Sequence, residues 1–94
     1  MDKRLEEILH ITQEECAEVT QAISKVFRFG FSGIHNGKSN KQHLEEELGD
    51  LECMIELIKA EFAVDEVEVV KAKVRKAEKL NRWSTHIRTK VVEI

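Results

Sequence analysis

Two pairs of acidic residues, Glu15 with Glu18 and Glu47 with Asp50, have a spacing that suits metal chemistry. Residues three apart are neighbours on the surface of a helix, so each pair projects from one side of its helix. Where two such helices pack together, four carboxylates converge and repel one another, and a divalent cation relieves that repulsion. Oxygen ligands without histidine favour Mg²⁺, with Mn²⁺ as a substitute, over zinc.

The position of these acids on their helices supports the same interpretation. At about 100° per residue, Glu47 falls within roughly 45° of the centre of an apolar face, and Asp50 lies at the edge of that face. The face comprises Leu44, Leu48, Leu51 and Ile55. An ionised carboxylate directed toward a core is costly unless something neutralises it. A lone ExxE is common in glutamate-rich helices, so the prediction rests on the inward Glu47 and on the second pair.

Three amphipathic segments position these acids, at about residues 3–27, 40–62 and 66–83. Apolar residues recur in them at spacings of three and four, which is typical of helices. Ser39 or Asn40 is suited to begin the second helix, and Asp65 the third, with Glu68 at its capping-box position. We therefore predict an all-α fold, a bundle of three main helices in one domain over residues 1–94. The main stripe of the first helix is Leu5, Leu9, Thr12, Cys16, Val19, Ile23 and Val26.

A second apolar line on the first helix indicates that the bundle is completed by another chain. Ile8, Ile11 and Ala22 lie beside the main stripe. A helix with apolar residues on two sides usually packs against two partners, and a short chain gains burial from a second subunit. We expect a homodimer or a dimer of dimers.

The segment between the first two helices contains three glycines at positions 30–37 and is predicted to be a loop. Arg28 and Lys38 are candidates for binding phosphates. Phe29, Phe31 or Asn36 would line a base pocket, or else the phenylalanines close the end of the bundle. No phosphate-binding P-loop motif is present. The pattern of residues 85–94 does not distinguish a strand, a helical extension or a disordered end.

Composition and charge exclude several classes of protein. The chain has no proline, 41% hydrophobic and 35% charged residues, and a net charge of −3, typical of a globular protein with no general attraction for nucleic acid. No apolar run approaches the roughly 18 residues needed to cross a membrane, and no signal peptide is evident. Two cysteines without CxxC spacing indicate reduced thiols and a cytoplasmic protein.

With these motifs in view, the sequence resembles the MazG-type, all-α nucleoside triphosphate pyrophosphohydrolases, including compact single-domain members, some of them encoded by bacteriophages. The resemblance covers residues 5–83. It lies in the segments Glu14-Glu15-Cys16-Ala17-Glu18, Arg28-Phe29-Gly30, Glu47-Leu48-Gly49-Asp50 and Lys79-Leu80-Asn81-Arg82-Trp83.

The resemblance implies a Mg²⁺-dependent hydrolase that converts an NTP or dNTP and water to the monophosphate and pyrophosphate. Glu15, Glu18, Glu47 and Asp50 would bind the metal, which holds the triphosphate and activates a water. Glu14 would bind a further ion or orient water. Lys79 and Arg82 would contact phosphate oxygens, and Asn81 the nucleotide, although exposed surface charge explains the two basic residues equally well.

Two other classes of function remain open. A non-catalytic helical dimer that binds partners through its amphipathic faces requires Glu47 to be paired with a base. A DNA-binding module would use the basic segment at residues 71–82, but it leaves the inward carboxylates unexplained. Glu7 and His10 form a single ExxH, whereas di-iron bundles need two. The Nudix arrangement of glutamates is absent.

Overall fold

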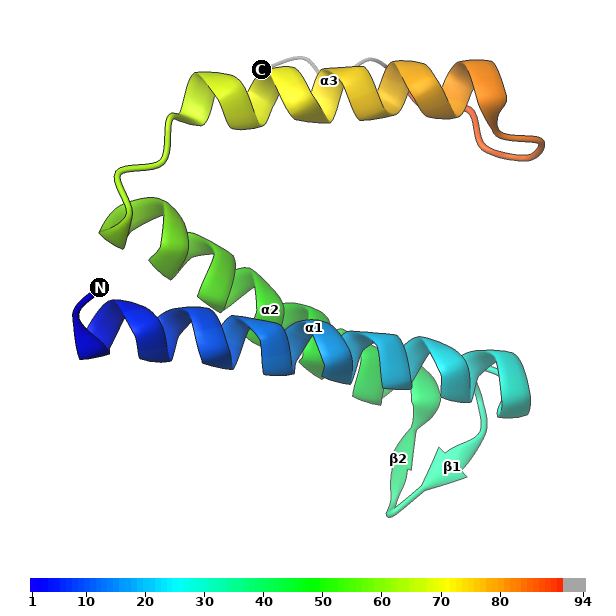
Figure 1. Ribbon diagram of the computed structural model, residues 1–94. Helices are drawn as coiled ribbons and strands as arrows, with labels where there is room; N and C mark the ends of the chain where they lie inside the picture. The colour runs from blue at the N-terminus through cyan, green and yellow to red at the C-terminus, as the bar shows by residue number, and fades with distance from the viewer. Residues whose placement is uncertain (91–94) are drawn as a thin grey trace. The chain divides into compact units, whose positions relative to one another are not determined.

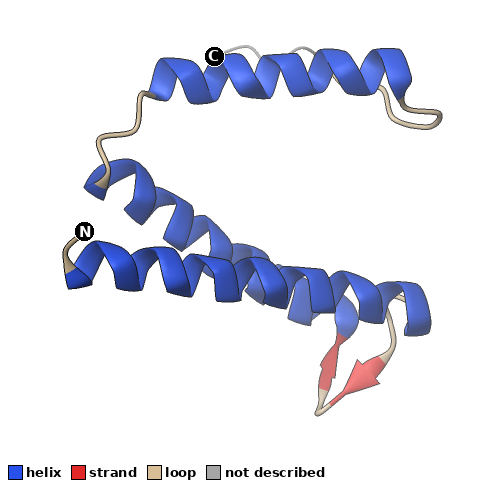
Figure 2. Ribbon diagram, in the orientation of Figure 1, coloured by secondary structure: helices blue, strands red, loops and turns tan. Residues whose placement is uncertain are grey.

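The computed structural model describes residues 1–90, which form three helices and a short hairpin (Figures 1 and 2). The predicted all-α class is confirmed, and the helix ends lie within two residues of the predicted ranges. The chain divides into two compact units, Met1–Ala63 and Val64–Ile94, and each is described by itself. The elements are α1 (Lys3–Phe29), β1 (Ile34–His35), β2 (Lys38–Ser39), α2 (Asn40–Glu61) and α3 (Glu66–Trp83).

Side chains next to the helix ends satisfy backbone groups that the helices leave unpaired. The Asp2 carboxylate accepts a hydrogen bond from the backbone N–H of Leu5 at 2.9 Å, which begins α1. Ser39 caps α2 through a capping box with Gln42. Asp65 caps α3, but the predicted capping-box role of Glu68 is wrong. The Glu68 carboxylate instead lies 3.4 Å from the ammonium of Lys71.

The predicted loop between α1 and α2 contains a β-hairpin, which the sequence analysis did not predict. His35 pairs with Lys38 and Ile34 with Ser39 in antiparallel register. The two residues between the strands, Asn36 and Gly37, have φ angles of 51° and 78°. A two-residue hairpin turn of this hand requires positive φ at both positions, and Asn-Gly is the sequence that favours it most.

Helices α1 and α2 lie side by side and are antiparallel, since α1 leads into the hairpin and α2 leads back from it (Figure 1). Their contact buries Ile8 and Ala22 of α1 and Met54 of α2. The predicted main stripe of α1 is therefore not the face against α2, because the second line, which contains Ile8 and Ala22, occupies that position. Part of the main stripe stays exposed on the flank, as do apolar residues of α2. The large exposed residues of these two helices are Ile23, Phe27, Phe29, Leu48 and Ile55.

One buried amide connects the end of α1 to the start of α2. Asn40 is only 4% exposed. Its side-chain Nδ2 donates a hydrogen bond to the carbonyl of Gly30 at 2.9 Å, and its backbone N–H donates to the carbonyl of Gly33 at 2.8 Å. Gly33 has no room for a side chain, because an added Cβ would lie 2.8 Å from both the Asn40 Nδ2 and the Phe29 carbonyl oxygen. Asn40 and Gly33 therefore fix the hairpin against both helices.

We expect Asn40→Ala to lower the free energy of unfolding by about 0.5–1.5 kcal/mol, because the hydrogen bond from the buried Asn40 amide to the Gly30 carbonyl is lost. Urea unfolding followed by circular dichroism measures the change. Gln21→Ala, an exposed substitution on α1, is the matched control and should be nearly neutral. Equal stability of the two variants would contradict the assigned role of Asn40.

Candidate metal centre

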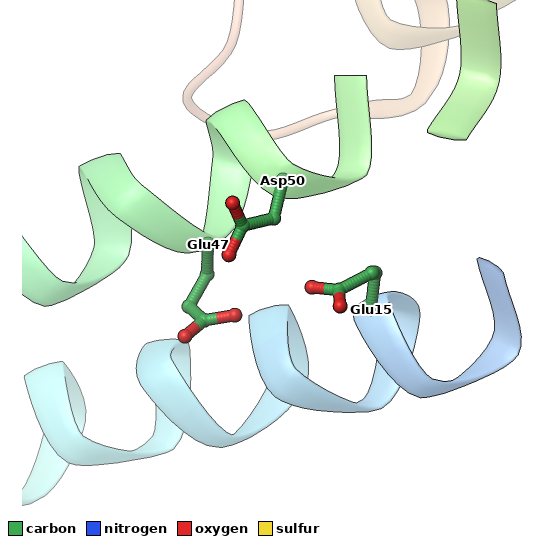
Figure 3. Close-up of side chains that lie close together, drawn as sticks. All are labelled: Glu15, Glu47 and Asp50. Carbon is green, nitrogen blue, oxygen red and sulfur yellow. The ribbon is translucent and has the colours of Figure 1, made fainter. Parts of the chain in front are cut away.

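Three carboxylates meet between α1 and α2. Glu15 of α1 faces Glu47 and Asp50 of α2, and one carboxylate oxygen from each lies within 4.8 Å of the others (Figure 3). The two α2 residues share a side of their helix because they are three residues apart. Glu15 lies on the same face of α1 as Ile8 and Ala22, seven residues to either side, and this face packs against α2. We call these three residues the acidic cluster.

The acidic cluster is partly withdrawn from solvent. The Glu47 side chain is 13% exposed, Glu15 is half-buried, and Asp50 is exposed. Desolvation raises the pKa of Glu15, and the negative charges of Asp50 and Glu47 raise it further. Burial and like charges disfavour the ionised form of this carboxylate. A bound cation would stabilise that form, because it offsets the negative charge.

The structure brings together three of the four carboxylates that the sequence pairs predict. Glu18 is exposed and stands outside the acidic cluster, as does Glu14. A step of three residues turns a helix by about 300°, so Glu18 points roughly 60° away from the direction of Glu15. The negative charges of both residues nevertheless contribute to the raised pKa of Glu15.

The donor atoms fit a hard divalent cation. The acidic cluster offers carboxylate oxygens alone, the ligands that Mg²⁺ and Mn²⁺ prefer. Oxygens on opposite sides of one Mg²⁺ are separated by about 4.2 Å, twice the Mg–O distance. The oxygens of the acidic cluster lie within 4.8 Å of one another, which is close to that separation.

In metal-free protein, we expect Glu15→Gln to raise the melting temperature at neutral pH. Because its pKa is raised in the fold, Glu15 holds its proton more tightly there than in the unfolded chain. Its penalty on stability is therefore complete above the raised pKa and disappears as the pH falls below the ordinary value of 4.5. Thermal unfolding of wild type and variant with a chelator present, from pH 4 to pH 8, measures the difference.

The control for this experiment is Glu56→Gln, which removes an exposed carboxylate from α2. It should change the melting temperature little at any of these pH values. A Glu15→Gln protein that melts at or below the wild-type temperature at neutral pH would contradict the repulsion inferred for the acidic cluster.

Two adjoining hollows lie where α1 and α2 meet the hairpin. They measure about 600 and 420 Å³ and share Lys25, His35 and Asn40 in their walls. Arg28 and Phe29 line the larger hollow, and Asn36, Lys38 and His43 line the smaller one. Of the predicted loop residues, Phe31 lines neither. A phosphate or a base would meet cationic and aromatic groups together there.

The predicted cations of this region have different surroundings. The guanidinium of Arg28 lies over the ring of Phe29, 4.9 Å from its centroid. The ammonium of Lys38 lies 2.9 and 3.0 Å from the two carboxylate oxygens of Glu46. Glu46 therefore neutralises part of the charge of Lys38, whereas Arg28 is exposed and pairs with no carboxylate among residues 1–90.

Sequence reasoning missed Lys25, His35 and His43 as residues of this region. Lys25 and His35 carried no recognisable signal, because the hairpin that brings them together was not predicted. His43 did carry one, since it stands four residues before Glu47 and so faces it on the helix. Its Nε2 lies 3.8 Å from a Glu47 carboxylate oxygen.

The remaining predicted residues, Lys79, Asn81 and Arg82, belong to α3 in the second unit. Lys79 and Arg82 are exposed. The Asn81 amide binds the backbone of Thr89 twice, through Nδ2 to the carbonyl oxygen at 2.8 Å and through Oδ1 to the N–H at 2.6 Å. Residues 84–90, which follow α3, therefore turn back along that helix. The predictions for residues 91–94 lie outside the described part.

Comparison with known proteins gives one match. The family model described as the MazG nucleotide pyrophosphohydrolase domain matches residues 3–83. Neither the curated proteins nor the solved structures include a match to the chain. In residues 1–90 no helix has the length and apolar character needed to span a membrane.

Proposed function

Since the chain belongs to the MazG nucleotide pyrophosphohydrolase domain family, and is thereby a hydrolase acting on nucleotides, we propose that it splits nucleoside or deoxynucleoside triphosphates with the help of Mg²⁺. The products are the nucleoside monophosphate and pyrophosphate, so the bond that breaks joins the α-phosphate to the β-phosphate and water supplies the new oxygen. The observation that supports this most directly is the acidic cluster of Glu15, Glu47 and Asp50 between two packed helices.

In this proposal the acidic cluster holds the cation, with Glu18 close by as a further ligand and Glu14 as a ligand of a second ion or a residue that orients water. A divalent cation bound there would neutralise the phosphate chain and stabilise the charge that develops as pyrophosphate leaves. Glu47 is the least exposed ligand in this proposal, since only 13% of its side chain is exposed.

Basic residues would hold the phosphates and the nucleotide. Arg28 lines the larger hollow at the hairpin together with Phe29, and Lys38 lines the smaller one. On α3, Lys79 and Arg82 are proposed to bind phosphate oxygens, and Asn81 the nucleotide. The bonds of Asn81 to the backbone of Thr89 use one of the two N–H donors and one of the two oxygen lone pairs of the amide, so the other donor and lone pair would serve this role.

We further propose that the active form is a homodimer or a dimer of dimers. Ile23 is 42% exposed and Phe27 87% exposed on α1, and Leu48 and Ile55 of α2 are 43% and 40% exposed. Apolar residues at this density on two adjacent helices favour burial against another chain. Analytical ultracentrifugation tests the assembly, and a mass equal to one chain would contradict it.

A product assay tests the reaction. The purified protein is incubated with each common ribo- and deoxyribonucleoside triphosphate and Mg²⁺, and the products are separated by anion-exchange chromatography. We expect equal amounts of monophosphate and pyrophosphate, and no turnover with a chelator in place of Mg²⁺. Release of orthophosphate, or inertness toward every triphosphate, would favour the non-catalytic helical dimer instead.

A further inference from the structure

His43 occupies the boundary between the acidic cluster and the smaller hollow. It lies in the first turn of α2 and is half-buried, with 33% of its side chain exposed. On one side it lines the hollow together with Lys25, His35 and Lys38. On the other, its Nε2 lies 3.8 Å from Oε1 of Glu47. His43 thus places a basic group within 4.0 Å of a carboxylate of the acidic cluster.

Glu47 needs a partner that fixes its orientation. Its carboxylate is held among the negative charges of Glu15 and Asp50, so repulsion favours rotation away from them. The side chain of a glutamate has three rotatable bonds, and only some of their combinations direct the carboxylate toward the other two. A neighbouring N–H that binds one carboxylate oxygen restricts these combinations and leaves the other oxygen available.

We propose that His43 is a positioning residue for Glu47, donating the hydrogen on Nε2 to Oε1 so that the carboxylate is directed into the acidic cluster. This rests on the proposed function of the acidic cluster as a metal site. The spacing of four residues on one helix places the two side chains on the same side. A neutral imidazole with its proton on Nε2 is sufficient. The present 3.8 Å separation needs to shorten by less than about 1 Å to reach hydrogen-bond length.

Such a partner affects the affinity for metal more than the stability of the fold. Residues that orient metal ligands typically contribute about 10- to 100-fold to metal affinity. We therefore expect His43→Ala to weaken Mn²⁺ binding by at least about tenfold. His43→Gln keeps an N–H donor at comparable reach and is expected to restore affinity to within about threefold of wild type. His10→Ala, an exposed histidine on α1, is the matched control and should bind as wild type does.

The test uses the full chain without nucleotide. Mn²⁺ binding is titrated by electron paramagnetic resonance, and the melting temperature of each variant is measured with a chelator present. Long-range ¹H–¹⁵N spectra of the metal-free protein report which imidazole nitrogen of His43 carries the proton, and we expect Nε2.

The outcomes separate this inference from the proposed function. Weakened binding in His43→Ala with recovery in His43→Gln supports the positioning role. Wild-type affinity in His43→Ala, equal weakening in both variants, or a proton on Nδ1 alone would overturn it while the metal site stands. Absence of saturable Mn²⁺ binding by the wild-type chain would remove the metal site, and the positioning role with it.

Discussion

Replacement of Asp50 by asparagine is expected to lower the rate of pyrophosphate release by at least about 100-fold. The substitution preserves the shape of the side chain but removes one negative charge from the acidic cluster. A metal ion contributes several kcal/mol of transition-state stabilisation, and each 1.36 kcal/mol corresponds to about tenfold in rate. The helical signal in circular dichroism should be unchanged, because Asp50 is exposed and asparagine keeps the shape of its side chain.

The control is Glu52→Gln, which neutralises an exposed carboxylate on the same helix outside the acidic cluster. It should retain turnover close to wild type. Steady-state turnover with a triphosphate at saturating Mg²⁺ is the measurement, and undiminished activity in Asp50→Asn would remove Asp50 from the site. Glu18→Gln belongs in the same series, and a matching loss of turnover there would support Glu18 as a fourth ligand.

Binding of Mg²⁺ is expected to stabilise the folded protein strongly. Mg²⁺ at 100 times its dissociation constant is expected to raise the melting temperature by about 10 °C or more, since binding at that ratio stabilises a protein by about 2.7 kcal/mol. In Glu47→Gln this increase should disappear, because the least exposed carboxylate of the cluster no longer carries a charge. Differential scanning calorimetry with and without Mg²⁺ measures the increase in melting temperature for wild type and for Glu47→Gln.

Glu47→Gln should also melt higher than wild type when a chelator is present, since one of three mutually repelling charges has been removed. Glu45→Gln is the control, because Glu45 is exposed on the same helix and pairs with Lys41. It should keep the stabilisation by Mg²⁺. A Glu47→Gln protein that Mg²⁺ stabilises as much as wild type would show that another residue holds the cation.

The fold class can be predicted from local features of the sequence. Apolar residues at helical spacing mark all three helices, and Ser39 and Asp65 begin α2 and α3 through their own side chains. The start of a helix can be predicted from neighbouring residues, because a capping side chain binds backbone groups within three residues of it. The hairpin was equally local. Its signal is the dipeptide Asn36-Gly37, which favours a two-residue turn between the strands that the structure shows.

The face that each helix turns toward its neighbour could not be predicted in the same way. Two apolar lines on α1 are compatible with the sequence, and the structure packs the weaker one, with Ile8 and Ala22, against α2. The choice depends on the pairing of two helices, and so on residues distant in the chain. It also explains why Glu15, which belongs to that line, meets α2 while Glu18 points aside.

The sequence alone determined that acidic pairs lie on amphipathic helices and that Glu47 is directed toward the apolar side, because both follow from helical periodicity. Only the tertiary structure decided which carboxylates meet, that His43 stands beside Glu47, and that Lys25 and His35 share the wall of a hollow. The reason is physical: periodicity fixes directions around one helix axis, whereas distances between side chains on different elements depend on how those elements pack.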